Sequence, residues 1–101
     1  MELQTYQNIN NQQNLEMGLY TAAVDIYPGE THTFITGSIS TAVAYCNKHY
    51  QQGEFDGCHV FSPAGKEIFS MSDELEIDLL DSSIIPILQV RFPIAFENIN
   101  K

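Results

Sequence analysis

Apolar and polar positions alternate from Leu19 to Tyr27, which is the period expected of a strand with one buried face. Pro28-Gly29 then marks a turn, and the residues from Thr31 to Thr36 are rich in β-branched and aromatic side chains. The pattern therefore predicts a β-hairpin over the first third of the chain.

A helical period follows this hairpin. Ser38 or Ser40 can accept hydrogen bonds from the first free backbone N–H groups as the N-cap, and Gly53 suits the position just past the C-terminus. The spacing predicts an amphipathic helix between these signals. The residues on its apolar face are Ile39, Val43, Cys46 and Tyr50.

A second hairpin and a further strand are predicted beyond the helix. Gly57–Ser62 and Glu67–Met71 flank the turn residues Pro63–Lys66. Ile84–Phe92 is an apolar run that predicts another strand, and Pro86 confines that strand to a sheet edge or a bulge. The pattern as a whole predicts an α+β fold with two layers, in which one amphipathic helix packs on a mostly antiparallel sheet of about five strands.

A polar segment precedes this domain. Residues 1–16 hold eight Asn or Gln residues between Gln4 and Asn14, so they are expected to form a loose arm that buries little surface. Residues 17–101 are expected to form a single α+β domain, because 101 residues lie within the usual range for one domain.

Much of the charge is concentrated in one later segment. Six carboxylates and no cation occur between Glu67 and Asp81. Acidic and apolar residues alternate from 74 to 79, so a strand would turn its acidic side chains to one face at intervals of about 6.6–6.8 Å. We predict that this segment binds a partner. Its site residues are Asp73, Glu74, Glu76, Asp78 and Asp81.

A short helix is the alternative for this segment, because Asp73 could cap it with Glu76 three residues further on. In a helix Leu75 and Leu79 would share a face, whereas Ile77 would not. A strand buries all three apolar residues together and is therefore the preferred interpretation.

The chain as a whole is strongly acidic. It carries 13 carboxylates against 4 Lys or Arg residues, for a formal net charge of −9. Such a surface is repelled by nucleic-acid phosphates and anionic lipid headgroups, so we expect no direct nucleic-acid binding and no membrane binding. The expected partner is a basic protein or a nucleoprotein complex. The alternative is that the charge only keeps the protein in solution.

A row of acids could also imitate the phosphates of a nucleic acid. One carboxylate per about 6.7 Å is half the linear charge density of one DNA strand, which carries a charge every 3.4 Å or so. The imitation would therefore be partial.

The sequence also bears on the compartment of the protein. The polar N-terminal residues predict no secretory leader, and no apolar run reaches the roughly 18–20 residues that span a membrane. Cys46 and Cys58 are then expected to be reduced, buried thiols in a cytoplasm, that of a bacterial host if the protein is phage-encoded.

No catalytic or cofactor motif is present among the nucleotide, hydrolase and metalloprotease patterns. A zinc site built from Cys46, His49 and Cys58 lacks a C-x₂-C pair, and Cys46 belongs to the apolar face of the helix. The calcium-loop pattern is also missing. We therefore predict a binding protein rather than an enzyme, with no catalytic residue, metal ligand or cofactor.

The hairpin–helix–hairpin run from Thr21 to Met71 includes GSISTAVAYCNKHYQQGEFDGCHVF and is followed by the acidic stretch from Asp73 to Asp81. This layout resembles the small acidic proteins that phages and mobile elements carry against bacterial defences, anti-CRISPR inhibitors in particular. The resemblance covers most of the chain and lies in size, charge and layout, so it transfers no binding residue. It implies a stoichiometric, non-enzymatic inhibitor of a basic, nucleic-acid-handling complex.

Three other functions remain open. An immunity-type protein that neutralises a basic nuclease toxin would need the same acidic surface. A small structural or assembly protein could use the Asn- and Gln-rich arm as its adhesive part. A small enzyme is the third.

Overall fold

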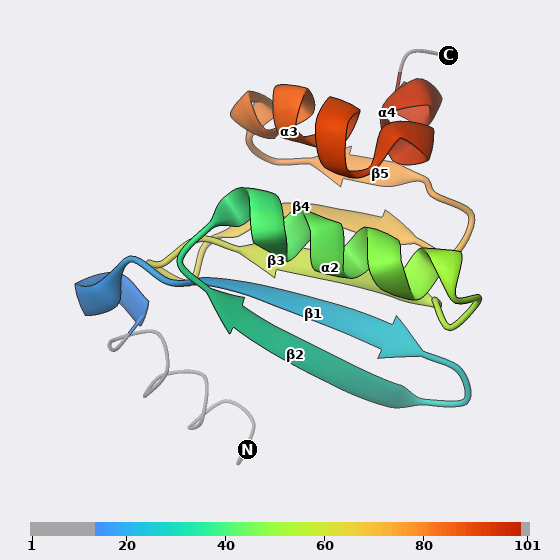
Figure 1. Cartoon of the computed structure of the whole chain (residues 1–101), viewed down its shortest axis with the longest axis horizontal. Coiled ribbons are helices and arrows are strands. Elements are labelled where there is room, and N and C mark those ends of the chain that lie inside the picture. The colour runs from blue at the N-terminus through green and yellow to red at the C-terminus, as the bar shows by residue number, and fades with distance from the viewer. Residues whose placement is uncertain (1–13, 100–101) are drawn as a thin grey trace.

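The computed structural model describes residues 14–99, which form one five-stranded antiparallel sheet and several helices (Figure 1). The strand order is β2-β1-β3-β4-β5, and each strand is antiparallel to its neighbours. The predicted α+β class and the antiparallel sheet of five strands are therefore confirmed. The strands are β1 (Tyr20–Ile26), β2 (Glu30–Thr36), β3 (Gly57–Phe61), β4 (Glu67–Ser72) and β5 (Ile77–Leu79).

The helices lie on one face of this sheet (Figure 1). Helix α2 packs on β1, β2 and β3, while α4 contacts β5 and α3 packs against α2. The helical layer is thus built from several helices, where the sequence predicted one. The helices are α2 (Ile39–Gln51), the 3₁₀ turn η1 (Ser82–Ile84), α3 (Ile85–Arg91) and α4 (Pro93–Ile99).

Most of the predicted polar arm, residues 1–13, lies outside the described residues. Its last residues belong to a helical turn at positions 14–17. In this turn the buried side chain of Asn14 donates a hydrogen bond to the hydroxyl of Thr21 at 3.1 Å.

Both predicted hairpins are confirmed, and alternation decides which side chains enter the core. Ala22, Val24 and Ile26 of β1 are buried. Val24 pairs with Cys58 of β3, which pairs in turn with Met71 of β4, so one row of side chains crosses three strands beneath the helices.

Helix α2 forms where the sequence predicts it. The hydroxyl of Ser38 accepts a hydrogen bond from the backbone N–H of Thr41 at 3.3 Å, which is the N-cap contact. Gly53 takes a φ of 76° just beyond the last turn, a conformation that favours glycine. Val43 and Cys46 of the predicted apolar face are fully buried.

The predicted strand over Ile84–Phe92 is wrong, because this segment forms η1, α3 and the link to α4. Pro86 lies in the first turn of α3, where the missing N–H of proline breaks no helical hydrogen bond. Ile84, Leu88 and Phe92 are all fully buried at intervals of four residues, the period of one helical face. The residues between these positions are mostly apolar too, so the four-residue spacing does not stand out in the sequence.

Helix α2 and the α3–α4 segment are joined by an aromatic cluster. The ring of Phe92 lies 5.6 Å from that of Tyr50 in α2 and 6.3 Å from that of Phe55 in the following connection, measured between centroids. These rings join α3 to α2 and to the connection that follows it, within the same hydrophobic core.

Candidate functional site

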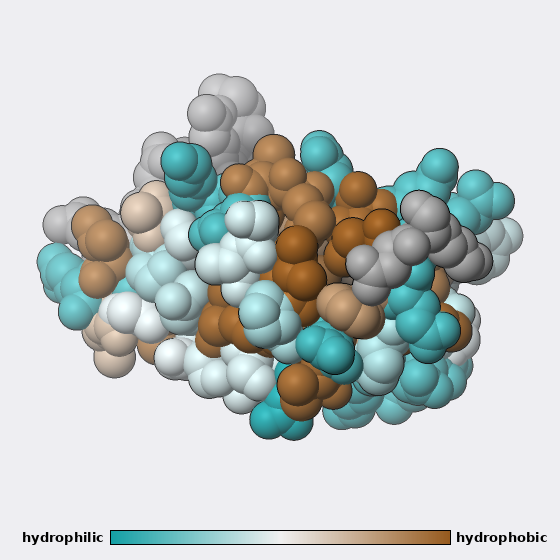
Figure 2. All heavy atoms as spheres, turned by 90° about the horizontal axis from the view of Figure 1, so that it is seen from above, coloured by the Kyte–Doolittle hydropathy of each residue, from teal (hydrophilic) through white to brown (hydrophobic). Residues whose placement is uncertain are grey.

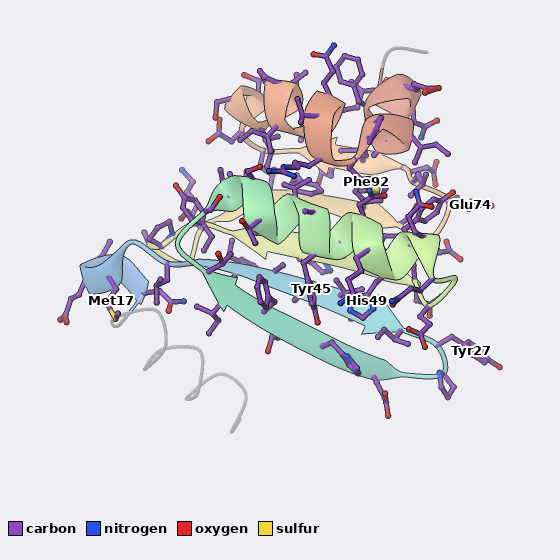
Figure 3. All side chains as sticks on the ribbon, in the orientation of Figure 1. Met17, Tyr27, Tyr45, His49, Glu74 and Phe92 are labelled. Carbon is purple, nitrogen blue, oxygen red and sulfur yellow. The ribbon has the colours of Figure 1, made fainter. Side chains whose placement is uncertain are left out.

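Three chain connections lie at one end of the sheet, and each of them carries or directly precedes exposed carboxylates. Antiparallel pairing places the β1–β2 turn, the α2–β3 connection and the β4–β5 turn together at this end, which lies on the right in Figures 1 and 3 near the labelled Tyr27 and Glu74. All six acidic residues of this end are exposed. We call them the acidic end. They are Glu30, Glu54, Asp56, Asp73, Glu74 and Glu76.

Few positive charges counter the acidic end. Among the described residues, Lys66 lies in the β3–β4 turn at the opposite end of the sheet. The Nε of Arg91 donates to the hydroxyl of Ser40, 2.6 Å away, in the first turn of α2 and therefore also away from the acidic end. Lys48, in the last turn of α2, is left as the described cation near it. The C-terminus of α2 points to this end and adds the negative pole of the helix dipole.

The β4–β5 turn holds its acidic residues through Ser72. The hydroxyl of Ser72 accepts hydrogen bonds from the backbone N–H groups of Glu74 at 3.3 Å and Glu76 at 3.1 Å. Leu75 lies between them with a φ of 63°, and the residue is buried. Asn98 of α4 donates a hydrogen bond to the carbonyl of Leu75. The turn is thus anchored on both sides while its carboxylates project into solvent.

This turn corrects the predicted strand over 74–79, because extended pairing with β4 is confined to Ile77–Leu79. The left-handed backbone at Leu75 interrupts the alternation. Leu75 is buried as predicted, and Ile77 and Leu79 pack against the core. Glu74 and Glu76 therefore leave from a turn and form no evenly spaced row with Asp78, so the partial phosphate ladder expected of a strand is not built.

The two remaining predicted site residues lie elsewhere on the same edge of the fold. Asp78 pairs with Ser70 and faces away from the helices. Asp81 caps η1, where the hydroxyl of Ser83 donates to its carboxylate at 2.7 Å and the backbone N–H of Ser83 at 3.0 Å. These two hydrogen bonds lower the pKa of Asp81. The structure therefore places Asp73, Glu74 and Glu76 together and separates Asp81 from them by the length of β5.

The sheet face opposite the helices holds a small network that the sequence did not predict. His59 of β3 lies between two carboxylates, with Nδ1 2.5 Å from Glu67 Oε2 and Nε2 4.0 Å from Asp25 Oδ2. The hydroxyl of Thr31 donates to the same Asp25 at 2.8 Å. Alternation from the buried Val24 and Cys58 already placed Asp25 and His59 on this face, but their pairing needed the register between the strands. The network extends negative charge across the open face.

A second histidine is buried between α2 and β2. The ring of His49 meets those of Tyr45 at 4.7 Å and His32 at 5.7 Å, both edge-on (Figure 3). Its Nδ1 has no hydrogen-bond partner among the described residues. Burial first, and then the nearby His32, lower the pKa of His49, while Glu54 raises it and Lys48 lowers it further. A neutral imidazole is therefore favoured here.

The two cysteines are free and fully buried. A hydrogen bond with the Cys46 thiol, together with burial, raises the pKa of Cys58 well above its usual value. Both thiols therefore pack as small apolar groups. Between residues 14 and 99 no group of three or more His, Cys, Asp and Glu side chains is arranged to hold a metal ion.

Half of the acidic end was outside the predicted site. Glu30 follows the Pro28-Gly29 turn, and Glu54 follows Gly53 at the end of α2. Each turn signal was visible in the sequence, but only the antiparallel strand order places these turns at the same end of the sheet as the β4–β5 turn that carries Glu74.

Comparisons of the chain with protein-family models, with curated proteins and with solved structures give no match. In the part of the chain that the structure describes, no helix is long and apolar enough to cross a membrane.

Proposed function

We propose that the protein is a non-enzymatic inhibitor that binds a basic, nucleic-acid-handling protein complex through its acidic end, in the manner of an anti-CRISPR protein. The observation that carries this proposal is the convergence of six exposed carboxylates from three connections at one end of the sheet. A cytoplasmic location in a bacterial host belongs to the same proposal.

Several features support a binding role for this end. The acidic side chains are exposed to solvent, so the unbound protein pays no cost for burying unpaired charges and a partner can reach them directly. Ser72 and Asn98 fix the backbone of the β4–β5 turn, which limits the entropy lost when a partner orders it. Clustered charge of one sign accelerates encounter with a partner of the opposite sign and selects against other acidic surfaces.

The experiment compares two matched double variants. Glu54→Gln with Glu74→Gln removes two charges from the acidic end, whereas Glu16→Gln with Glu67→Gln removes two charges at the opposite end of the fold. Both pairs change net charge equally and keep side-chain shape. Each immobilised protein is used to capture partners from a bacterial lysate, and the captured nuclease or nucleoprotein complex is then assayed for cleavage of its nucleic acid.

We expect the unsubstituted protein to capture a basic nucleoprotein complex and to block its activity. The acidic-end variant should bind roughly two- to thirtyfold more weakly, because each exposed charge pair contributes about 0.2–1 kcal/mol. The opposite-end variant should bind normally. Salt at about 1 M, where the screening length is roughly 3 Å, should also release the partner. Capture of a single nuclease would favour the immunity-type alternative, and binding indifferent to both salt and the acidic-end variant would refute the proposal.

A further inference from the structure

Strand β5 forms one edge of the described sheet, and its register shows which backbone groups face that edge. Hydrogen bonds join Ser72 N–H to the Glu76 carbonyl at 3.0 Å and Leu80 N–H to the Ile68 carbonyl at 3.0 Å. Bonded pairs recur at every second residue of an antiparallel ladder, so the backbone groups of Asp78 also point to β4. The N–H and C=O groups of Ile77 and Leu79 therefore point outward, and no strand among residues 14–99 pairs with them.

A hollow of about 240 Å³, whose lining is partly polar and partly apolar, lies beside this edge. Ile77 and Leu79 of β5 line it together with Asn98 and Ile99 of α4. Figure 2, which views this side of the molecule, shows apolar side chains gathered near the middle, with hydrophilic side chains around them. Exposed large apolar residues also come from this part of the chain. They are Val90 and Ile94, with 72% and 44% of their surface exposed.

The other side of the same edge carries one carboxylate within the strand. Asp78, which pairs with Ser70, projects to the open face, and the carboxylates of Glu76 and Asp81 are exposed just before and just after β5. A strand added to β5 would alternate its side chains between the side of the hollow, where Ile77 and Leu79 lie, and the open face that carries Asp78. We propose that β5 receives an extended segment of the partner in which apolar residues alternate with Lys or Arg. This inference rests on the proposed function, since it assigns to the basic partner one mode of docking by strand addition.

Charge argues against the other occupants of the edge. A second copy of the chain, paired through β5 about Asp78, would set this carboxylate against its own copy, and like charges directly opposite each other destabilise a sheet. Each copy also carries a net charge of −9. The other edge strand of the described sheet, β2, has no acidic residue apart from Glu30 at its start. It therefore offers a basic strand fewer charges to pair with than β5 does with Glu76 and Asp81 beside it. The occupant that fits β5 is therefore basic on one face and apolar on the other.

The test uses the full chain and three capped heptapeptides. The first alternates Lys and Val, the second has the same composition with the Val residues in one block, and the third alternates Glu and Val. Amide hydrogen exchange by NMR reads out each residue. At saturating Lys–Val peptide, the amides of Ile77 and Leu79 should exchange roughly tenfold more slowly or better, the factor for about one net hydrogen bond. The amide of Leu80, which already donates to Ile68, should change less.

Two charge reversals complete the test. Asp78→Lys should weaken binding of the Lys–Val peptide by roughly tenfold and improve binding of the Glu–Val peptide, because it reverses the cross-strand pairs on the open face. Glu16→Lys makes the same charge change away from β5 and outside the acidic end, so it should leave the order of the peptides unchanged. Equal binding of the block peptide, protection on β2, or no protection at Ile77 and Leu79 would overturn strand addition. If capture of the natural partner still depends on Glu54 and Glu74, the proposed function stands without it.

Discussion

The β4–β5 turn makes a prediction that reverses the usual ranking of alanine and glycine. Leu75 combines a φ of 63° with an exposure of only 8% for the residue. For a residue with a Cβ atom this backbone conformation costs about 1–2 kcal/mol, which burial of the leucine side chain, contributing about 1.5–3 kcal/mol, offsets. Leu75→Ala removes most of the burial and keeps the strain, so we expect a loss of about 2–3 kcal/mol, the low end for a buried leucine.

Leu75→Gly should be the more stable of the two variants. Glycine relieves the strain of about 1–2 kcal/mol, whereas its greater freedom in the unfolded chain costs only about 0.4–1 kcal/mol. The free energy of unfolding should therefore be roughly 0.5–1 kcal/mol higher for Leu75→Gly than for Leu75→Ala. Leu79 in the extended β5 provides the matched control, since there glycine should be less stable than alanine by about 0.5–1 kcal/mol.

Urea unfolding followed by circular dichroism measures all four variants, and the chain contains no tryptophan to serve as a fluorescence probe. At each position the free energy of unfolding of the glycine variant is compared with that of the alanine variant. Both variants lose most of the leucine side chain, so most of the lost packing cancels in the difference. If glycine were the less stable substitution at both positions, the strain assigned to Leu75 would be absent, and with it the reason why the acidic turn interrupts the strand.

Two further predictions concern buried titratable groups. Burial and the nearby His32 lower the pKa of His49, so its contribution to stability is complete above about pH 6.5 and is lost as the pH falls, because the unfolded chain takes up the proton first. Urea midpoints between about pH 8 and 5 should fall less steeply for His49→Gln, and an unchanged slope would contradict this assignment. The hydrogen bond with Cys46 and burial raise the pKa of Cys58, and both cysteines are fully buried. Ellman's reagent should therefore label neither thiol until the protein unfolds. Labelling of the native protein at the rate seen in urea would show that the thiols are accessible.

Local signals in the sequence were sufficient for the elements between residues 20 and 72. The alternation in β1, the cap at Ser38 and the glycine at 53 each depend on neighbours within one turn or one strand. The strand predicted for Ile84–Phe92 was wrong because a continuous apolar run fits a buried strand and a buried helix equally. Pro86 favours the first turn of a helix as much as a sheet edge, and burial of Ile84, Leu88 and Phe92 decides between them.

The acidic end shows where sequence reasoning stops. The charge of Asp73, Glu74 and Glu76 was evident from the sequence alone. Their position at the same end of the sheet as Glu30 and Glu54 depends on the order and direction of the strands. The turn geometry depends on long-range partners as well, since Asn98 of the last helix holds the carbonyl of Leu75. Side chains that are far apart in the sequence can be assigned to one surface only when the order of the strands is known.

The order of the strands in the sheet also determines which steps of folding require a long loop to close. Of the four strand pairings in the described sheet, β1–β2, β3–β4 and β4–β5 join strands that follow one another in sequence. Only β1–β3 spans an intervening strand and helix. The entropy of closing a long loop therefore falls on a single step, in which α2 brings the two hairpins side by side, and the remaining contacts form between near neighbours.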